Sequence, residues 1–239
     1  MIAGIVWRAA LIVIALVTIG VQLDRHAKRV PSAADSVPSV LRSSAQLPIA
    51  AYAVAGEEQS ALEEAELLVR RRPLPAEHLR VLAQAQANAG LADEAALTVQ
   101  YAARRGWRDP LIQEGMLRLA WSAGDTSEAA RRYTALFLRR DTQDALLEEF
   151  GAAILGEAGG DGRKTLIEIV GGGERWHNQF LRRGARVMPT DAFVEVIEET
   201  IAQGTQYECA GLEQAQRTIS TRDEAAGLQL VLIIEAQCV

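Results

Sequence analysis

The sequence predicts an all-α fold of antiparallel helix pairs that follows one membrane-spanning helix. The helix pairs are predicted by a repeat, because a glycine precedes an alanine by five positions three times, at intervals of 34 residues. Within the repeats, apolar residues recur at spacings of three and four, which is typical of packed amphipathic helices. The membrane helix is predicted by the apolar N-terminus. The glycine and alanine pairs are Gly56 and Ala61, Gly90 and Ala95, and Gly124 and Ala129.

Residues 1–29 are predicted to form a signal anchor, that is, an uncleaved transmembrane helix. No charge occurs from Ala9 to Leu23, and Arg8 is the one charge in the 22 residues from 2 to 23. A helix of this length can cross the ~30 Å hydrocarbon core of a bilayer. A cleaved signal peptide and a buried N-terminal helix are the alternatives. The absence of a good small-x-small cleavage site favours the anchor.

The orientation of this anchor rests on conflicting signals. Arg25, Lys28 and Arg29 follow the span and by the positive-inside rule would keep the rest of the chain in the cytoplasm. The signal-like N-terminus and the two cysteines favour the opposite side. We expect a single-pass inner-membrane protein with its repeat domain in the periplasm.

Residues 30–48 are predicted to be a linker. They contain Pro31, Pro38, Pro48 and five serines, and few large side chains. A poorly formed first helix is the alternative for this segment.

Residues 49–158 are predicted to hold the helical repeats. Pro75 and Pro110 stand where helices are expected to begin, a position at which the missing N–H is tolerated. Glycines stand where helices are expected to end. Pro48 is expected to shorten the first helix of the first repeat. The helices are expected at about residues 57–71, 76–89, 92–105, 110–123, 127–139 and 143–157.

The repeat resembles the tetratricopeptide repeat (TPR) family, in which each 34-residue unit forms two helices. The middle unit carries the resemblance through Leu79, Leu82, Ala83, Gly90, Ala95, Val99 and Ala102. The resemblance implies an α-solenoid whose first helices line a concave, partner-binding surface. The alternative is that Trp121 is covered and the charged positions are merely solvated. The positions implied for a protein partner are Arg80, Gln84, Asn88, Glu114, Arg118 and Trp121.

Residues 159–206 are predicted to add further helices, and residues 207–239 to form a β-hairpin. Glycine-rich turns flank a short apolar segment, 165–170, and helices are expected at 176–188 and 191–203. The β-branched segment 217–222 and the apolar run 228–234 are predicted to be the hairpin strands. A terminal helix is the alternative to this hairpin.

Cys209 and Cys238 flank the C-terminal segment. In an oxidising compartment a disulfide between them would close a loop of about 30 residues. A free, buried pair of thiols is the alternative.

Composition and motifs favour a protein without catalytic activity. The formal net charge of −6 and the lack of a long basic block argue against a nucleic-acid partner. The chain contains no phosphate-loop motif, no Cys-x-x-Cys and no histidines at metal spacing, so we expect no cofactor and no metal. His26, His78 and His177 lie in different regions, and among them His177 beside Trp176 has the most site-like context.

A second resemblance is to membrane-anchored bacterial repeat proteins associated with exopolysaccharide production and export. The residues that carry it lie at 73–75, 79–83, 102–109 and 135–140. Together the resemblances imply a scaffold in the cell envelope that mediates protein–protein interaction, within polysaccharide assembly or export. The alternatives are a maturation factor of a membrane complex without a discrete ligand, and a carbohydrate-binding module in the C-terminal segment.

Overall fold

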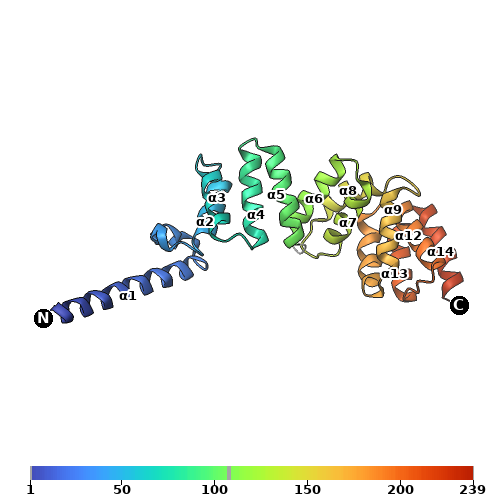
Figure 1. Cartoon of the computed structure of the whole chain (residues 1–239). Helices are drawn as coiled ribbons and strands as arrows, with labels where there is room; N and C mark the ends of the chain where they lie inside the picture. Colours follow the sequence, from blue (N-terminus) through green and yellow to red (C-terminus); the bar gives the residue numbers. More distant parts are fainter. Residues whose placement is uncertain (1, 107–108, 239) are drawn as a thin grey trace. The chain divides into compact units, whose positions relative to one another are not determined.

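The structure, a computed structural model, describes residues 2–106 and 109–238, and only the backbone of Ile2 and Ala3. These residues form fourteen α-helices, three short 3-10 segments and one π-helical segment, and no strand occurs among them. They divide into two compact units, Met1–Ile112 and Gln113–Val239, each of which is described by itself. Figure 1 follows the helices in chain order. The prediction of an all-α fold is therefore confirmed for the described residues.

The first unit contains α1 to α5 and the start of α6. The bounds are α1 Ile2–Ala27, 3-10 segments Pro31–Ser36 and Ser39–Leu41, α2 Gln46–Ala55, α3 Ala61–Arg71, α4 Ala76–Asn88, α5 Ala92–Arg105 and α6 Pro110–Ser122. Trp107 and Arg108, part of the segment that carries the second resemblance, lie outside the described residues.

The second unit contains the rest of α6 and the helices up to α14. The bounds are α7 Thr126–Phe137, α8 Asp144–Leu155, α9 Asp161–Gly171, 3-10 segment Glu174–Trp176, α10 His177–Gln179, π-helical segment Phe180–Gly184, α11 Ala185–Val187, α12 Thr190–Ala202, α13 Cys209–Ser220 and α14 Glu224–Gln237. Three of these elements follow one another without a break: α10, the π-helical segment and α11. Residues 177–187 are therefore called the arginine helix below.

Successive helices pack as antiparallel pairs, as the repeat predicts. In the first unit α2 packs on α3 and α4 on α5, and in the second α13 packs on α14. The alanine of each glycine–alanine pair is buried: Ala61 and Ala95 are less than a tenth exposed and Ala129 is fully buried. A methyl side chain at these places lets neighbouring helices approach closely.

Two of the three repeat glycines adopt the left-handed conformation. Gly90 has a φ of 77° and Gly124 a φ of 75°. In each case the next residue's N–H donates back across the helix end at 2.9 Å, Leu91 to the Gln86 oxygen and Asp125 to the Ala120 oxygen. A Cβ at either glycine would strain this backbone.

The first repeat departs from this pattern by one position. Gly56 has a φ of −84°, and Glu57 carries the left-handed backbone with a φ of 51°. The Glu58 N–H donates to the Ala53 oxygen at 2.9 Å, so the turn closes as in the other repeats. Gly56 thus stands at the end of α2, but the left-handed residue is Glu57, because this helix ends one residue later than in the other repeats.

Replacing Glu57 by glycine is expected to stabilise the first unit by about 0.5 to 1 kcal/mol. Glu57 is exposed and holds a backbone conformation that L-residues adopt at a cost of roughly 1 to 2 kcal/mol. Part of the gain is offset by the added freedom of glycine in the unfolded chain. Urea unfolding of Glu57→Gly measures the change, with Glu58→Gly as the control at normal φ. A Glu57→Gly protein less stable than wild type would contradict this account.

The segment expected as a linker is folded against its neighbours. Pro48 lies in the first turn of α2, where its missing N–H leaves no hydrogen bond unmade. Ala34, Val37 and Ala45 are buried with Ala27 of α1. The segment thus forms a small core between the end of α1 and the start of α2.

Asp24 joins α1 to this segment by hydrogen bonds. Its carboxylate accepts from the backbone N–H groups of Ser43, Ser44 and Ala45 at 2.8 to 2.9 Å. One turn earlier on α1, a Cβ at Gly20 would lie 2.2 Å from Leu41 Cδ1. The last two turns of α1 are thereby fastened to the residues that lead into α2.

One core runs through the second unit from Leu117 on α6 to Leu230 on α14. Within it α7 packs on α8 and α9, and α9 packs on α12. Phe137, Phe180 and Phe193 form an aromatic row, with ring centroids 6.4 and 5.2 Å apart. Residues 159–206 and 207–239, expected as separate segments, both contribute side chains to this core.

The β-hairpin expected in residues 207–239 is wrong. Residues 217–222 lie mostly in α13, and 228–234 lie within α14. Asp223, expected in a hairpin turn, caps α14 by accepting the Ala226 N–H at 3.1 Å. The apolar run is compatible with a helix because Ala226 and Leu230, four residues apart, are both buried. Residues 165–170, expected as a short segment between turns, are likewise helical, in α9.

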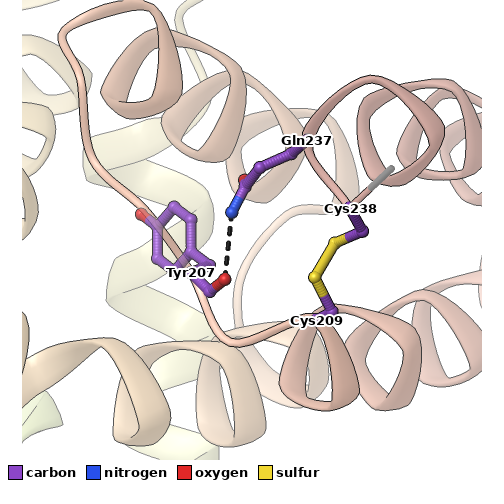
Figure 2. The surroundings of a disulfide bond; sticks show 4 residues. All are labelled: Tyr207, Cys209, Gln237 and Cys238. Atoms are coloured by element: carbon purple, nitrogen blue, oxygen red, sulfur yellow. Dashed lines mark hydrogen bonds between the residues drawn. A yellow bond between two sulfur atoms is a disulfide. The ribbon is translucent and has the colours of Figure 1, made fainter.

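The structure joins Cys209 and Cys238 by a disulfide (Figure 2). The bond connects the first residue of α13 to the residue after α14. Beside it, Gln237 Nε2 donates to the Tyr207 backbone oxygen at 2.9 Å. Burial raises the pKa of the Tyr207 phenol to about 12, and its hydroxyl is hydrogen-bonded to Thr200 at 2.7 Å. The disulfide indicates an oxidising compartment.

Candidate functional site

Three of the six predicted partner-binding residues lie on one face of α4. Arg80, Gln84 and Asn88 are spaced by four residues, so they share that face. Gln84 Nε2 donates to Asn88 Oδ1 at 2.8 Å, and Asn88 Nδ2 donates to the Val54 oxygen at 3.3 Å. Arg80 Nε lies 3.4 Å from Asp109 Oδ2, which forms an ion pair. This face is polar, and its side chains are largely satisfied within the unit.

Asn88 also lines a hollow of about 360 Å³ in the first unit. The hollow lies where the turn after α2 meets the end of α4. Its lining residues are Glu57, Glu58, Gln59, Ala61, Leu62, Ala85, Asn88 and Ala89. Two glutamates and no basic residue line it, so it favours cationic or uncharged groups over anions.

The other three predicted residues lie on α6 in the second unit. Glu114 Oε1 accepts from Arg118 at 2.8 Å, and the Arg118 guanidinium carbon lies 5.0 Å from the centre of the Phe150 ring on α8. The Trp121 side chain is 41% exposed, so the alternative in which it is covered does not hold within this structure. An exposed tryptophan one turn from an arginine is a typical hot-spot pair.

The structure brings the predicted residues together as two groups of three. In the α4 group Gln84 is hydrogen-bonded to Asn88, and in the α6 group Arg118 forms an ion pair with Glu114. The α4 group belongs to the first unit and the α6 group to the second from Gln113 on. The α6 group is the more apolar of the two because it includes Trp121 and the neighbouring Phe150 ring.

The second unit also contains a basic pocket that was not predicted from the sequence. The pocket has a volume of about 410 Å³ and lies between the α7–α8 connection and the arginine helix. Two doublets, Arg139-Arg140 and Arg182-Arg183, were the available signal, but nothing in the sequence shows that they meet. The lining residues are Arg140, Asp144, Gln179, Arg182, Arg183 and Arg186.

Arg183 builds the floor of this basic pocket. Its side chain is 9% exposed and donates to the backbone oxygens of Phe137, Arg139 and Thr142. It also contacts Asp144 Oδ1 through Nη2 at 2.8 Å. One turn earlier, Gln179 Nε2 donates to the Leu138 oxygen at 2.8 Å. These bonds fasten the α7–α8 connection to the arginine helix.

The other arginines of the pocket retain unused hydrogen-bond donors. Arg182 is exposed, and among the described residues its side chain makes one hydrogen bond, from Nε to the Asn178 oxygen at 3.2 Å. The Arg186 side chain is 60% exposed and lies 3.8 Å from Asp144 Oδ2. Arg140 is exposed and has no ion pair or hydrogen bond within the described residues. Nearby, hydrogen bonds from Arg139 lower the pKa of Asp141 and occupy its carboxylate.

The histidines do not converge. His26 is exposed, while His78 is fully buried with Nδ1 2.8 Å from the Arg72 oxygen. His177 is also buried, with Nε2 3.1 Å from the Val170 oxygen. Among residues 2–106 and 109–238, no three His, Cys, Asp or Glu side chains are grouped to hold a metal ion.

Comparison of the chain with protein-family models, with curated proteins and with solved structures found no match. Within the described residues, one helix is long and apolar enough to cross a membrane, from Gly4 to Ala27. This helix has the properties of a signal sequence or an anchor. The interpretation of the site therefore rests on its own geometry.

Proposed function

We propose that the chain is a non-enzymatic, membrane-anchored scaffold of TPR-like helix pairs that binds a protein partner in the bacterial envelope. The observation that carries the proposal is the exposed Trp121 beside Arg118 on α6. The successive antiparallel helix pairs support the proposal, since such stacks offer extended surfaces for protein ligands. The C-terminal segment, in which the carbohydrate-binding alternative was placed, is helical and not a β-hairpin.

The contacts of α6 support partner binding at this surface. Arg118 is held over the Phe150 ring and against Glu114, so its guanidinium is positioned before any partner arrives. Such preorganisation reduces the entropy lost on binding. Trp121 adds a large apolar side chain that is still partly exposed to water. A partner that covers Trp121 and meets Arg118 with a carboxylate would use both.

Replacing Arg118 and Trp121 together by alanine is expected to weaken partner binding by at least ~30-fold, since one hot-spot residue alone contributes about 2 kcal/mol or more and the two contributions need not add. The measurement is co-purification from detergent-solubilised membranes, followed by titration with the purified partner. The matched control is Tyr101→Ala with Arg104→Ala, another arginine–aromatic pair, with Arg104 5.9 Å from the Tyr101 ring on α5. Equal binding by the α6 variant and wild type, with unchanged helical circular dichroism, would exclude this surface.

The anchor part of the proposal follows from how α1 is held. Gly20 and Asp24 are fastened to residues 41–45, which leaves residues 2–19 of α1 for the bilayer. Eighteen residues of helix span about 27 Å, close to the ~30 Å hydrocarbon core. The disulfide favours an oxidising side for the second unit. We infer a single-pass inner-membrane protein whose repeats lie in the periplasm.

The compartment is tested with a reporter enzyme that is active only in the periplasm, fused after Val239. Reporter activity, with cysteines that resist alkylation until they are reduced, is the expected result. An inactive reporter with freely alkylated cysteines would reverse the orientation. The basic residues Arg25, Lys28 and Arg29 would then be the dominant topological signal.

A further inference from the structure

We propose that the basic pocket of the second unit binds the diphosphate group of a small ester, a site distinct from the partner surface on α6. The pocket is lined by four arginines and one aspartate, which leaves three uncompensated positive charges. This concentration is notable because the whole chain carries a formal net charge of −6. Four arginines that share one acidic partner, Asp144, around a hollow attract anions.

The donors of the pocket suit phosphate oxygens. A guanidinium group presents paired N–H donors that match two oxygens of a phosphate or carboxylate. Arg182 and Arg186 are four residues apart and lie on one face of the arginine helix, so they can hold two neighbouring anionic groups. Arg140 faces the same hollow from the α7–α8 connection. A diphosphate places two linked anionic groups within reach of these three side chains.

The pocket is preorganised by groups that do not themselves need the ligand. Arg183 and Gln179 tie the α7–α8 connection to the arginine helix, which fixes the two walls relative to one another. Asp144 is already engaged by Arg183 and so repels an incoming anion less than a free carboxylate would. The π-helical segment Phe180–Gly184 contains Arg182 and Arg183. Segments of π-helix are rare in proteins overall, but those that occur are often found at functional sites.

A second hollow extends the site toward α13. It has a volume of about 260 Å³ and shares Arg182 and Arg186 with the basic pocket. Its other lining residues are uncharged: Leu181, Gln214, Ala215 and Thr218. A diphosphate ester fits both hollows, with its anionic end in the basic pocket and its uncharged part over α13. The ester can be a soluble molecule or a lipid headgroup, and the diphosphate is the chemistry that the two share.

The first test is a calorimetric titration with inorganic pyrophosphate of the full chain in a zwitterionic detergent. The buffer contains about 0.15 M salt, because a lower ionic strength would exaggerate surface electrostatic interactions. Saturable binding is expected, and the variant Arg182→Gln with Arg186→Gln is expected to bind at least ~10-fold more weakly. Both side chains are exposed, so the fold should be unchanged. The control is Arg70→Gln with Arg72→Gln, which removes the same charge from another exposed place and should change affinity less than ~2-fold.

Three outcomes would overturn the site. They are no saturable binding of pyrophosphate by wild type, equal affinity in the Arg182 and Arg186 variant, and an equal loss in the control pair. The source of the ligand is distinguished in a second titration. Tighter binding of a soluble nucleoside diphosphate than of pyrophosphate supports a soluble ester, and tighter binding to vesicles that contain a diphosphate lipid supports a headgroup. If neither exceeds pyrophosphate, the assignment of the second hollow is wrong.

Discussion

Replacing Cys209 and Cys238 by serine is expected to lower the free energy of unfolding of the second unit by about 3 to 4 kcal/mol. The disulfide spans a sequence separation of 29 residues. For a loop of this length the chain-entropy model gives about 3.6 kcal/mol of stabilisation. The bond also holds the C-terminal end of α14, whose Leu230 lies in the core while Leu228 and Leu232 are exposed. Without the bond, we expect the end of α14 to fray first.

Urea unfolding with and without reductant measures this effect. Wild type is expected to lose stability when the reductant is added, and the doubly substituted protein is expected to be insensitive to it. The insensitive variant is the control, because it shows that the reductant acts through this bond alone. A wild-type unfolding midpoint that does not move on reduction, with reduction verified by alkylation, would contradict the prediction.

The helix pairs could be predicted from the sequence because they depend on local chemistry. Gly90 and Gly124 mark helix ends through backbone conformation, and Ala95 and Ala129 mark close helix approach through size. Both signals recur with the repeat. The left-handed position in the first repeat could not be predicted, because Glu57, which a propensity argument disfavours, holds that backbone conformation. The neighbouring Gly56 looked like the natural choice.

The C-terminal helices could not be predicted by the same reasoning. A short apolar run such as 228–234 fits a buried strand and a buried helix equally well by periodicity. The helix begins after Asp223, whose carboxylate caps it and also accepts a hydrogen bond from Thr190, a residue distant in sequence. The basic pocket was missed for a similar reason. Arg140 and Arg182 line one pocket because the fold brings the α7–α8 connection to the arginine helix, where Arg183 donates to the Thr142 oxygen.

Replacing Arg163 by methionine is expected to destabilise the second unit by about 3 kcal/mol. Arg163 on α9 is 1% exposed and donates from Nε to the Leu155 oxygen at 2.6 Å. Its other nitrogens contact the Gly156 oxygen and the carboxylates of Asp191 and Glu195 on α12. The side chain thus satisfies carbonyls at the C-terminal end of α8, which lack partners within that helix.

Two contributions set the size of this effect. The loss of a buried partner destabilises the variant, and the access of water to the exposed Asp191 carboxylate reduces that loss. Removing one partner of a buried ion pair destabilises by roughly 3 to 5 kcal/mol, because the remaining groups lose their partners. Here the loss falls near the lower limit, since the Asp191 side chain is 65% exposed and regains water. The larger part therefore comes from the Leu155 and Gly156 carbonyls and from Glu195, whose side chain is 26% exposed. Methionine keeps most of the side-chain volume, so little of the change reflects a cavity.

The comparison that isolates this effect uses an exposed arginine. Arg131 forms an ion pair with Glu128 at 3.2 Å and is 57% exposed, so Arg131→Met is expected to change stability by less than ~0.5 kcal/mol. Asp191→Asn should also have a small effect, below ~1 kcal/mol, because that carboxylate is mostly in water. If Arg163→Met unfolds at the same urea concentration as wild type, apolar packing at this position replaces the polar network without loss, and the carbonyl account is wrong. If Asp191→Asn is as damaging as Arg163→Met, the stabilisation belongs to the ion pair instead.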